Sequence, residues 1–383
     1  MSSITLHSKL PNVGTTIFTV MSALAVEKKA VNLGQGFPDF DCDPRLVEAV
    51  TKAMQQGKNQ YPPMPGVPVL RDAVAAKIAA LYQRQYSAAT EITITAGATQ
   101  AILTIILAMV HPGDEVVVLE PCYDSYVPNI ELAGGVPVRV PLTPGTFRPD
   151  FAKIAAALTP KTRAIIVNSP HNPSGTVWTA VEMRQLEALL APTNVLLIRD
   201  EVYEHMVFDG QQHQSAAMFA GLAERAFVVS SFGKTYHVTG WKVGYVAAPA
   251  ALTQEFRKVH QFNVFTVNTP VQHGLAEYMA HQDAYLKLPD FYQQKRDFFR
   301  AGLKDSKFRL LPCEGTYFQC VDTSRINDLK EADFCQWLTS EIGVAAIPLS
   351  AFYGAGFDQQ VVRFCFAKKT ATLQLALDKL QRL

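Results

Sequence analysis

The chain has 383 residues, of which 48% are hydrophobic and 18% charged, and its formal net charge is +1. This length indicates two to three domain-sized units, and the composition is that of an ordinary globular protein. The near-zero net charge provides no electrostatic basis for binding nucleic acid or an anionic membrane, so we expect neither partner.

The sequence predicts neither a membrane span nor an export signal. The longest apolar stretch, Ala101 to Val110, is far shorter than the ~20 residues that a membrane-spanning helix needs. Residues 1–4 contain no basic segment followed by an apolar one. The six cysteines form no C-x-x-C pair and are typical of reduced thiols, so we expect a cytoplasmic protein without a metal site.

In chain order, the sequence predicts an N-terminal arm with one short helix, followed by alternating strands and helices from about residue 45. The helices are predicted over residues 18–29, 43–56, 69–82 and 99–110. The strands are predicted over residues 92–95, 115–119, 136–140, 164–167, 195–198, 227–230 and 244–247. Continuous Val, Ile and Leu runs separated by helices are typical of a mostly parallel sheet that is covered on both faces.

A second unit is predicted near the C-terminus. A long charged helix over residues 285–300 is followed by strands over residues 308–312, 317–321, 344–347 and 361–366. We therefore expect an α/β fold in which a large domain, residues 45–285, contains a seven-stranded, mostly parallel sheet between helices. A smaller α+β domain is expected over residues 286–383, and residues 1–44 are expected to form an N-terminal arm and part of that small domain.

Three of the predicted strands end in ionisable or amide side chains. Asn172 follows the run 164–167, Asp200 follows the run 195–198, and Lys234 follows the run 226–229. Because ligands of open α/β sheets bind beyond the carboxyl ends of the strands, these side chains are expected to converge. Taken alone, Lys234 would be a solvated surface lysine and Asp200 a helix cap or a surface turn. Together, a lysine, a carboxylate and nearby hydroxyl and amide groups are what pyridoxal phosphate requires.

The motifs around these residues resemble those of the fold-type-I, class I/II aminotransferases, which use pyridoxal 5'-phosphate. Within that family the chain is similar to the subgroup of bacterial methionine aminotransferases and kynurenine/glutamine-type transaminases. The resemblance extends from about Gly34 to Arg363. It is carried by the segments Leu33-Gly34-Gln35-Gly36-Phe37-Pro38, Asn168-Ser169-Pro170-His171-Asn172-Pro173, Arg199-Asp200-Glu201-Val202-Tyr203 and Ser230-Ser231-Phe232-Gly233-Lys234-Thr235.

The resemblance implies a role for each group around the cofactor ring. Lys234 would carry the cofactor as a Schiff base and move the α-proton of the substrate. Asp200 would pair with the ring nitrogen, and Tyr203 and Asn172 would bind the phenolic oxygen. Tyr123 would stack on the ring, although it could equally be an ordinary core aromatic.

The resemblance also implies a phosphate site and an assembly. The N-terminus of the helix at residues 97–99, together with Ser231 and Lys242, would bind the phosphate. Many relatives have an arginine where Lys242 stands, and lysine lacks its bidentate fork. Tyr61 would reach the phosphate of a neighbouring subunit, which implies a homodimer with shared active sites. The helix N-terminus consists of Gly97, Ala98 and Thr99.

For the substrate, the resemblance implies that Arg363 grips the α-carboxylate, beside Gly36 and Asn172. A solvent-facing arginine on an edge strand is the alternative interpretation of Arg363. We expect a side-chain pocket lined by apolar or aromatic residues, which are Ile17, Phe18, Tyr123, Phe265 and Tyr317.

The sequence thus predicts a transaminase with ping-pong kinetics. The expected donor is L-methionine, with Phe, Tyr, His, Gln or kynurenine as slower donors, and the acceptor is a 2-oxo acid. A pyridoxal-phosphate-dependent C–S β-lyase would use the same residues and stays an alternative. A ligand-sensing domain of a regulator would need a DNA-binding extension. A Rossmann dehydrogenase is disfavoured because the segment Gly34-Gln35-Gly36 lacks a third glycine.

Overall fold

The computed structural model describes residues 4, 6–354 and 357–383. The expected absence of an export signal is based on residues 1–4, and residues 1–3 lie outside the described residues. None of the helices in these ranges is long and apolar enough to cross a membrane.

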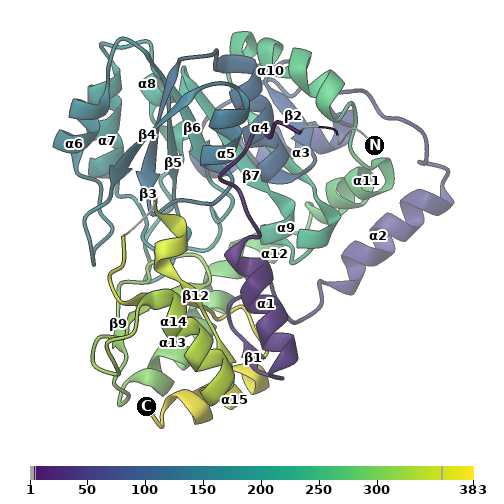
Figure 1. Ribbon diagram of the computed structural model, residues 1–383. Helices are drawn as coiled ribbons and strands as arrows, with labels where there is room; N and C mark the ends of the chain where they lie inside the picture. Colours follow the sequence, from purple (N-terminus) through teal and green to yellow (C-terminus); the bar gives the residue numbers. More distant parts are fainter. Residues whose placement is uncertain (1–3, 5, 355–356) are drawn as a thin grey trace.

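A seven-stranded sheet forms the centre of the larger part of the molecule (Figure 1). Strand β8 is antiparallel to both of its neighbours, and the other neighbouring strands are parallel. This confirms the predicted α/β fold with a mostly parallel sheet. In spatial order the strands are β2 (Ile92–Thr95), β8 (Gly244–Ala247), β7 (Ala226–Ser231), β6 (Leu196–Asp200), β5 (Thr162–Asn168), β3 (Glu115–Glu120) and β4 (Val136–Pro141).

The central strands are continuous aliphatic runs because helices cover both faces of the sheet. In β3, Val116 and Val118 pack in a core with helices α4 (Gly97–Met109), α5 (Tyr126–Leu132) and α10 (Ala250–Asn263). Val117 and Leu119 point the other way, into the main core. That second face is covered by α3 (Pro68–Tyr82), α6 (Phe151–Ala157), α7 (Ala180–Leu190) and α8 (Ala220–Ala223).

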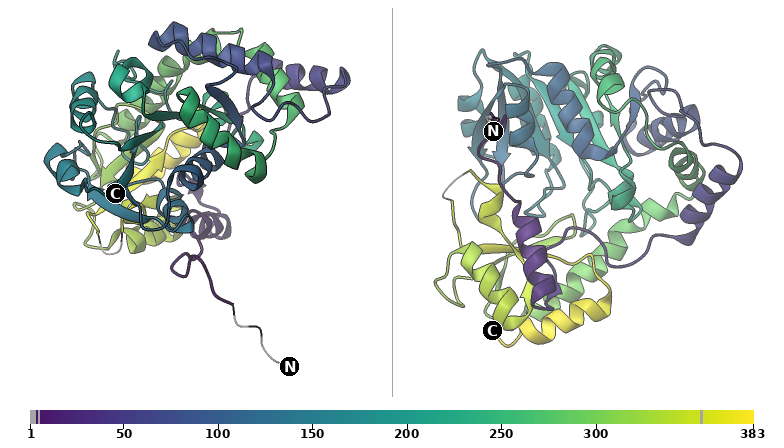
Figure 2. Two further views of the ribbon diagram at one scale, coloured as in Figure 1. Left: turned by 90° about the horizontal axis from the view of Figure 1, so that it is seen from above. Right: turned by 45° about the vertical axis from the view of Figure 1, so that its right-hand side comes forward.

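The first helices begin where the sequence supplies capping groups. Thr16 caps α1 (Ile17–Glu27), and Asp43 caps α2 (Pro44–Gln55), which starts with proline at its first turn. Helix α2 packs along α11 (Thr269–Tyr278), and both project from one side of the molecule (Figure 2). Short helical segments lie at Ala216–Met218, Thr239–Trp241, Leu338–Ile342 and Leu349–Phe352.

A smaller unit contains a four-stranded antiparallel sheet with the order β12 (Ile347–Pro348), β13 (Val361–Cys365), β10 (Phe318–Asp322) and β9 (Arg309–Leu310). Its helices are α13 (Leu288–Leu303), α14 (Glu331–Trp337) and α15 (Thr370–Leu380). The predicted helix over 285–300 is interrupted after α12 (Asp283–Leu286), and the predicted strand over 344–347 is divided into β11 (Val344–Ala345) and β12.

The N-terminal segment joins this smaller unit, because β1 (Val31–Asn32) pairs with β11 in parallel. Helix α1 lies beside the same strands (Figure 1). The proposed boundaries at residues 44 and 285 stay a prediction.

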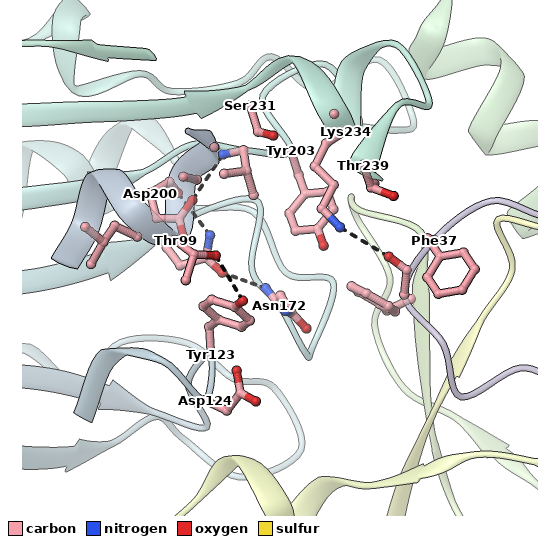
Figure 3. A pocket seen from close by; sticks show the side chains of 18 of the residues that line it. Phe37, Thr99, Tyr123, Asp124, Asn172, Asp200, Tyr203, Ser231, Lys234 and Thr239 are labelled. Atoms are coloured by element: carbon pink, nitrogen blue, oxygen red, sulfur yellow. Dashed lines mark hydrogen bonds between the residues drawn. The ribbon is translucent and has the colours of Figure 1, made fainter. Parts of the chain in front are cut away.

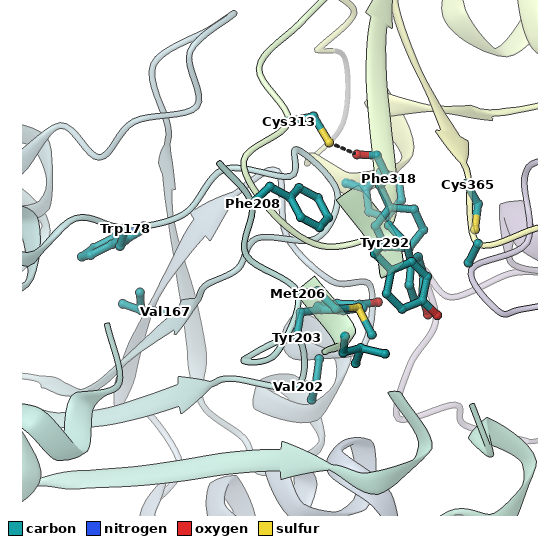
Figure 4. Packing of buried hydrophobic residues seen from close by; sticks show 14 of the residues in the cluster. Val167, Trp178, Val202, Tyr203, Met206, Phe208, Tyr292, Cys313, Phe318 and Cys365 are labelled. Carbon is teal, nitrogen blue, oxygen red and sulfur yellow. Dashed lines mark hydrogen bonds between the residues drawn. The ribbon is translucent and has the colours of Figure 1, made fainter. Parts of the chain in front are cut away.

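One hydrophobic core continues from the large sheet into the smaller unit. Figure 4 shows its junction, where Tyr203 and Phe208 lie near Tyr292 and Phe318. All six cysteines are free, and Cys42 is half-buried while the other five are buried. The core therefore ties the carboxyl end of β6 to the small sheet.

Candidate active site

A cavity of about 290 Å³ lies beyond the carboxyl ends of the parallel strands, between the large sheet and the smaller unit (Figure 3). Most of the predicted site residues line it. They are Phe18, Gly36, Gly97, Ala98, Thr99, Tyr123, Asn172, Asp200, Tyr203, Ser231, Lys234, Lys242 and Arg363.

Lys234 lies in the short helix α9 (Phe232–Thr235), directly after β7. Its Nζ donates hydrogen bonds to the Tyr317 hydroxyl at 2.7 Å and to the Gly36 carbonyl at 3.2 Å. Tyr317 also donates to the Gly36 carbonyl, at 2.6 Å. Burial is the main cause that lowers the pKa of Lys234, to about 8, so its amine is more readily deprotonated than that of an ordinary lysine.

Asp200 is the last residue of β6 and is buried. Its Oδ2 accepts a hydrogen bond from the Tyr126 hydroxyl at 2.6 Å, and its Oδ1 accepts one from the Val202 N–H at 3.2 Å. Burial raises the pKa of Asp200, while the bond from Tyr126 opposes this shift. Within the described residues no basic side-chain nitrogen lies within 4.0 Å of this carboxylate. A cationic ligand group would therefore stabilise its ionised form.

Arg363 is only 1% exposed, although it carries a guanidinium. Its Nη1 donates to Asn172 Oδ1 at 2.7 Å and its Nη2 to the Gly34 carbonyl at 3.2 Å. Its guanidinium lies 3.9 Å from the centre of the Phe318 ring. In the part of the chain that the structure describes, its Nε has no hydrogen-bond partner and no carboxylate lies within 4.0 Å. The alternative of a solvent-facing arginine is wrong.

Gly97 opens α4 with a positive φ of +79°, a conformation that favours glycine. A Cβ at this position would lie 3.6 Å from Lys242 Nζ. The first N–H groups of a helix have no partner inside that helix, so this corner offers donors to an anion beside a cationic side chain. The Thr99 hydroxyl lies 3.3 Å from the Tyr123 hydroxyl, which places Tyr123 against the same corner.

The cavity fits pyridoxal phosphate on these observations. Asp200 is a buried carboxylate without a basic partner among the described residues, which suits a protonated ring nitrogen. The N-terminus of α4 and Lys242 suit a phosphate. Lys234 has a lowered pKa and lies in the same cavity. The donor set is therefore complementary to the ring nitrogen, the phosphate and the aldehyde carbon of that cofactor.

Tyr61 and Phe265 are among the predicted residues that do not line this cavity. Tyr61 is 81% exposed and Phe265 is 44% exposed, and their rings pack edge to face with centres 5.3 Å apart. Phe265 follows the end of α10 with a positive φ of +67°, and its ring packs on that of the exposed Tyr61. Phe265 is absent from the cavity wall of its own chain, and its part in a side-chain pocket stays a prediction.

Ile17 and Tyr317 are also absent from the cavity wall. Tyr317 is fully buried and binds Lys234 instead, so its position in the expected side-chain pocket is corrected. Several residues that line or support the cavity were not predicted. They are Asp124, Tyr126, Asn168, Thr239 and Phe318. Asp124 and Tyr126 follow Tyr123 after β3, which is the same strand-end signal that indicated Tyr123.

The comparisons with known proteins agree with this geometry. The family model "Aminotransferase class I and II" matches residues 28–380. A methionine aminotransferase of Escherichia coli (strain K12) is 52% identical over 378 residues, which cover 98% of this chain and 98% of that protein. Human kynurenine–oxoglutarate transaminase 1 is 34% identical over 394 residues, which cover 94% and 93% of the two chains.

Solved structures give the same result. One, of an Escherichia coli protein identified as a methionine aminotransferase, has a TM-score of 0.98, 51% identity and full coverage of both chains. N-succinyldiaminopimelate aminotransferase of Mycobacterium tuberculosis has a TM-score of 0.95 and 41% identity, and covers 99% of this chain and 100% of its own. These relatives are named as aminotransferases or transaminases, and none of them is named as a lyase. The chain belongs to the class I and II aminotransferases and is a transaminase that depends on pyridoxal phosphate.

Proposed function

We propose that this transaminase moves the amino group of L-methionine to a 2-oxo acid, with phenylalanine, tyrosine, histidine, glutamine and kynurenine as slower donors. The observation that carries the choice of donor is the cavity wall. Arg363 is the one arginine of this wall within the described residues. The aromatic side chains of Phe18, Tyr123 and Phe318 line the same cavity. The 52% identity to a protein named methionine aminotransferase supports the same donor.

Arg363 binds the α-carboxylate of the substrate. Its guanidinium is held by Asn172, by the Gly34 carbonyl and by the Phe318 ring, so it loses little side-chain freedom when a carboxylate arrives. Burying a carboxylate elsewhere in the cavity without a cation would be costly. One arginine therefore favours donors with a single carboxylate.

When bound, pyridoxal phosphate carries the amino group between donor and acceptor and withdraws electrons from the substrate Cα. Asp200 would accept a hydrogen bond from the protonated ring nitrogen and keep it charged, and the bond from Tyr126 fixes the carboxylate for this role. Tyr203 and Asn172 would donate hydrogen bonds to the ring oxygen, and Tyr123 would pack on the ring. These residues line the same cavity as Lys234 and would hold the cofactor beside it.

Lys234 would hold the cofactor through Nζ in the resting enzyme, and its freed amine would move the proton of the substrate Cα. A pKa of about 8, lowered mainly by burial, leaves part of its amine unprotonated near neutral pH, and an unprotonated amine can accept the proton at Nζ. The Tyr317 hydroxyl and the Gly36 carbonyl hold this nitrogen at the cavity wall. At the other end, Ser231, Lys242 and the first N–H groups of α4 bind the phosphate.

The aromatic wall suits an unbranched thioether, because methionine adapts to irregular apolar spaces. Each methylene contributes only ~1–3 kcal/mol in such a pocket, so discrimination among apolar donors should be modest.

A donor screen tests the proposal. The purified holoenzyme is mixed with each amino acid and a fixed 2-oxo acid, and kcat/KM is measured. We expect methionine to rank first, and L-methionine alone to change the visible spectrum of the protein. Aspartate ranking above methionine and phenylalanine would contradict the proposed donor. Release of pyruvate and ammonia from a cysteine conjugate, without any 2-oxo acid, would favour a C–S β-lyase.

We also propose a cytoplasmic homodimer in which Tyr61 and Phe265 contribute to the site of the neighbouring subunit. An exposed pair of packed aromatic rings supports this assembly, since large apolar side chains at the surface often mark an interface. Tyr61→Phe and Lys234→Ala variants, each with impaired activity, should recover some activity when refolded together, because mixed dimers contain one site with both native residues. A monomeric mass without recovery would contradict the proposal.

A further inference from the structure

Asp124 is an acidic residue of the cavity wall to which the roles above assign nothing. It follows Tyr123 in the segment after β3 and is half-buried. Figure 3 shows its carboxylate below the Tyr123 ring. In the described part of the chain, no side-chain nitrogen of lysine, arginine or histidine lies within 4.0 Å of this carboxylate. Its charge is therefore not neutralised by an ion pair.

The surroundings of Asp124 act on its ionisation in opposite directions. Burial has the largest influence and raises the pKa of Asp124, while Arg363 and the backbone N–H groups of Asp124 and Ser125 partly oppose this shift. Arg363 and Asp124 thus place opposite charges in one small cavity. Once the α-carboxylate of a substrate neutralises Arg363, the charge of Asp124 is left without a compensating charge in the cavity that also receives the substrate side chain.

Among the described residues, the cavity wall offers no further cation to a second carboxylate. Of the basic residues that line the cavity within the described ranges, Lys234 and Lys242 bind the cofactor and Arg363 binds the α-carboxylate. An anionic side chain would therefore meet a like charge without a compensating partner, and like-charge juxtaposition discriminates against the wrong ligand. A neutral amide or imidazole N–H could instead donate to the Asp124 carboxylate.

We propose that Asp124 is a specificity-determining residue that disfavours donors and acceptors with an anionic side chain. This inference rests on the proposed function of the cavity. It identifies the substrate class as amino acids and 2-oxo acids whose side chains are neutral.

The test uses glutamine and glutamate, which have nearly the same shape and differ in charge. The ratio of their kcat/KM values is measured for the wild-type holoenzyme and for Asp124→Asn, which keeps the shape of the side chain. We expect the preference for glutamine to fall about tenfold in Asp124→Asn. Asp305→Asn makes the same change of charge at an exposed residue outside the cavity and should leave the ratio unchanged.

Binding of unreactive ligands gives a second readout. The Kd values of glutarate and of its monoamide are measured by calorimetry on the cofactor-loaded proteins. Asp124→Asn should reduce the ratio of the glutarate Kd to the monoamide Kd by a similar factor, about tenfold. An unchanged ratio in both assays, or an equal change in Asp305→Asn, would overturn the proposal. The proposal would also be overturned if Asp124→Asn raised kcat/KM equally for glutamine and glutamate and raised affinity equally for glutarate and its monoamide. Asp124 would then only compete with the substrate α-carboxylate for Arg363.

The two proposals can fail separately. If the wild-type protein transaminates neither methionine nor glutamine, the proposed donor fails, while the comparison of glutarate with its monoamide still tests Asp124. If transamination is normal and the charge preference does not move, the role of Asp124 alone is wrong.

Discussion

Two buried carboxylates near the end of β6, Asp200 and Glu204, have opposite surroundings. Glu204 Oε1 accepts hydrogen bonds from Lys77 at 2.7 Å, from Ser230 at 2.5 Å and from Tyr245 at 3.0 Å. Its Oε2 accepts one from Tyr82 at 2.5 Å. Asp200 accepts bonds from Tyr126 and from the Val202 N–H, and no cation of the described chain contacts it.

The pKa values respond accordingly. Burial opposes ionisation at both residues, and it raises the pKa of Asp200. At Glu204, Lys77 and the hydrogen bonds overcome burial and hold the pKa well below its usual range. A buried charge whose partners are all within the chain stabilises the fold, whereas one with an open position is available to a ligand.

The largest effect on activity is expected at Asp200, the carboxylate without a cationic partner among the described residues. Asp200→Asn removes the charge that keeps the cofactor ring nitrogen protonated, so transamination should fall by about 10³-fold or more while the cofactor stays bound. Single-turnover kinetics with methionine and the visible absorbance of the bound cofactor measure the two properties. Near-wild-type turnover would show that Asp200 is structural, like Glu204.

The second prediction concerns Glu204, the carboxylate whose hydrogen-bond and charge partners all lie within the chain. Lys77→Met leaves Glu204 buried without its cation and should lower the free energy of unfolding by about 3–5 kcal/mol. The side chains of Lys77 and Glu204 are only 6% and 2% exposed. The matched control is Lys52→Met, since the Lys52–Glu277 pair is 55% and 53% exposed and should contribute at most about 1 kcal/mol. Urea unfolding curves that shift equally for both variants would contradict this contrast.

The smallest effect is a shift in lysine reactivity. In cofactor-free protein, Lys234 should react with an acylating reagent with a midpoint near pH 8, because burial lowers its pKa to about 8 and the neutral amine is the nucleophile. Lys28 is the comparison, since the hydrogen bond from its ammonium to Glu27 raises its pKa. Peptide mapping across a pH series should show Lys234 modified first. If Lys234 and Lys28 react in parallel, the lowered pKa is wrong.

The sequence predicted the strands and the residues at their ends because these depend on local patterns. The aliphatic runs that gave β2 and β8 match the observed bounds, and Asp200 and Lys234 follow runs that became β6 and β7. Contacts between distant segments have no such signal. The bond from Tyr126 to Asp200 and that from Lys77 to Glu204 join residues far apart in the chain, so they require the folded sheet.

The position of Phe265 has a related cause. An aromatic residue after a helix is equally compatible with the cavity wall of its own chain and with the surface, and Phe265 is 44% exposed and packs on Tyr61. The division of strand 344–347 has the same origin, since β11 pairs with β1 and β12 pairs with β13. Pairing partners, and not composition, decide where these strands end.

The distribution of free thiols allows the local opening of the two units to be timed separately. Four of the five buried cysteines, Cys313, Cys320, Cys335 and Cys365, lie in the smaller unit, and Cys122 follows β3 of the large sheet. A thiol reagent can reach a buried sulfur only when the surrounding structure opens. Mass spectrometry of slowly alkylated protein would therefore report the opening of the smaller unit at four positions and that of the large sheet at one. The half-buried Cys42 would serve as the reference for reaction without local opening.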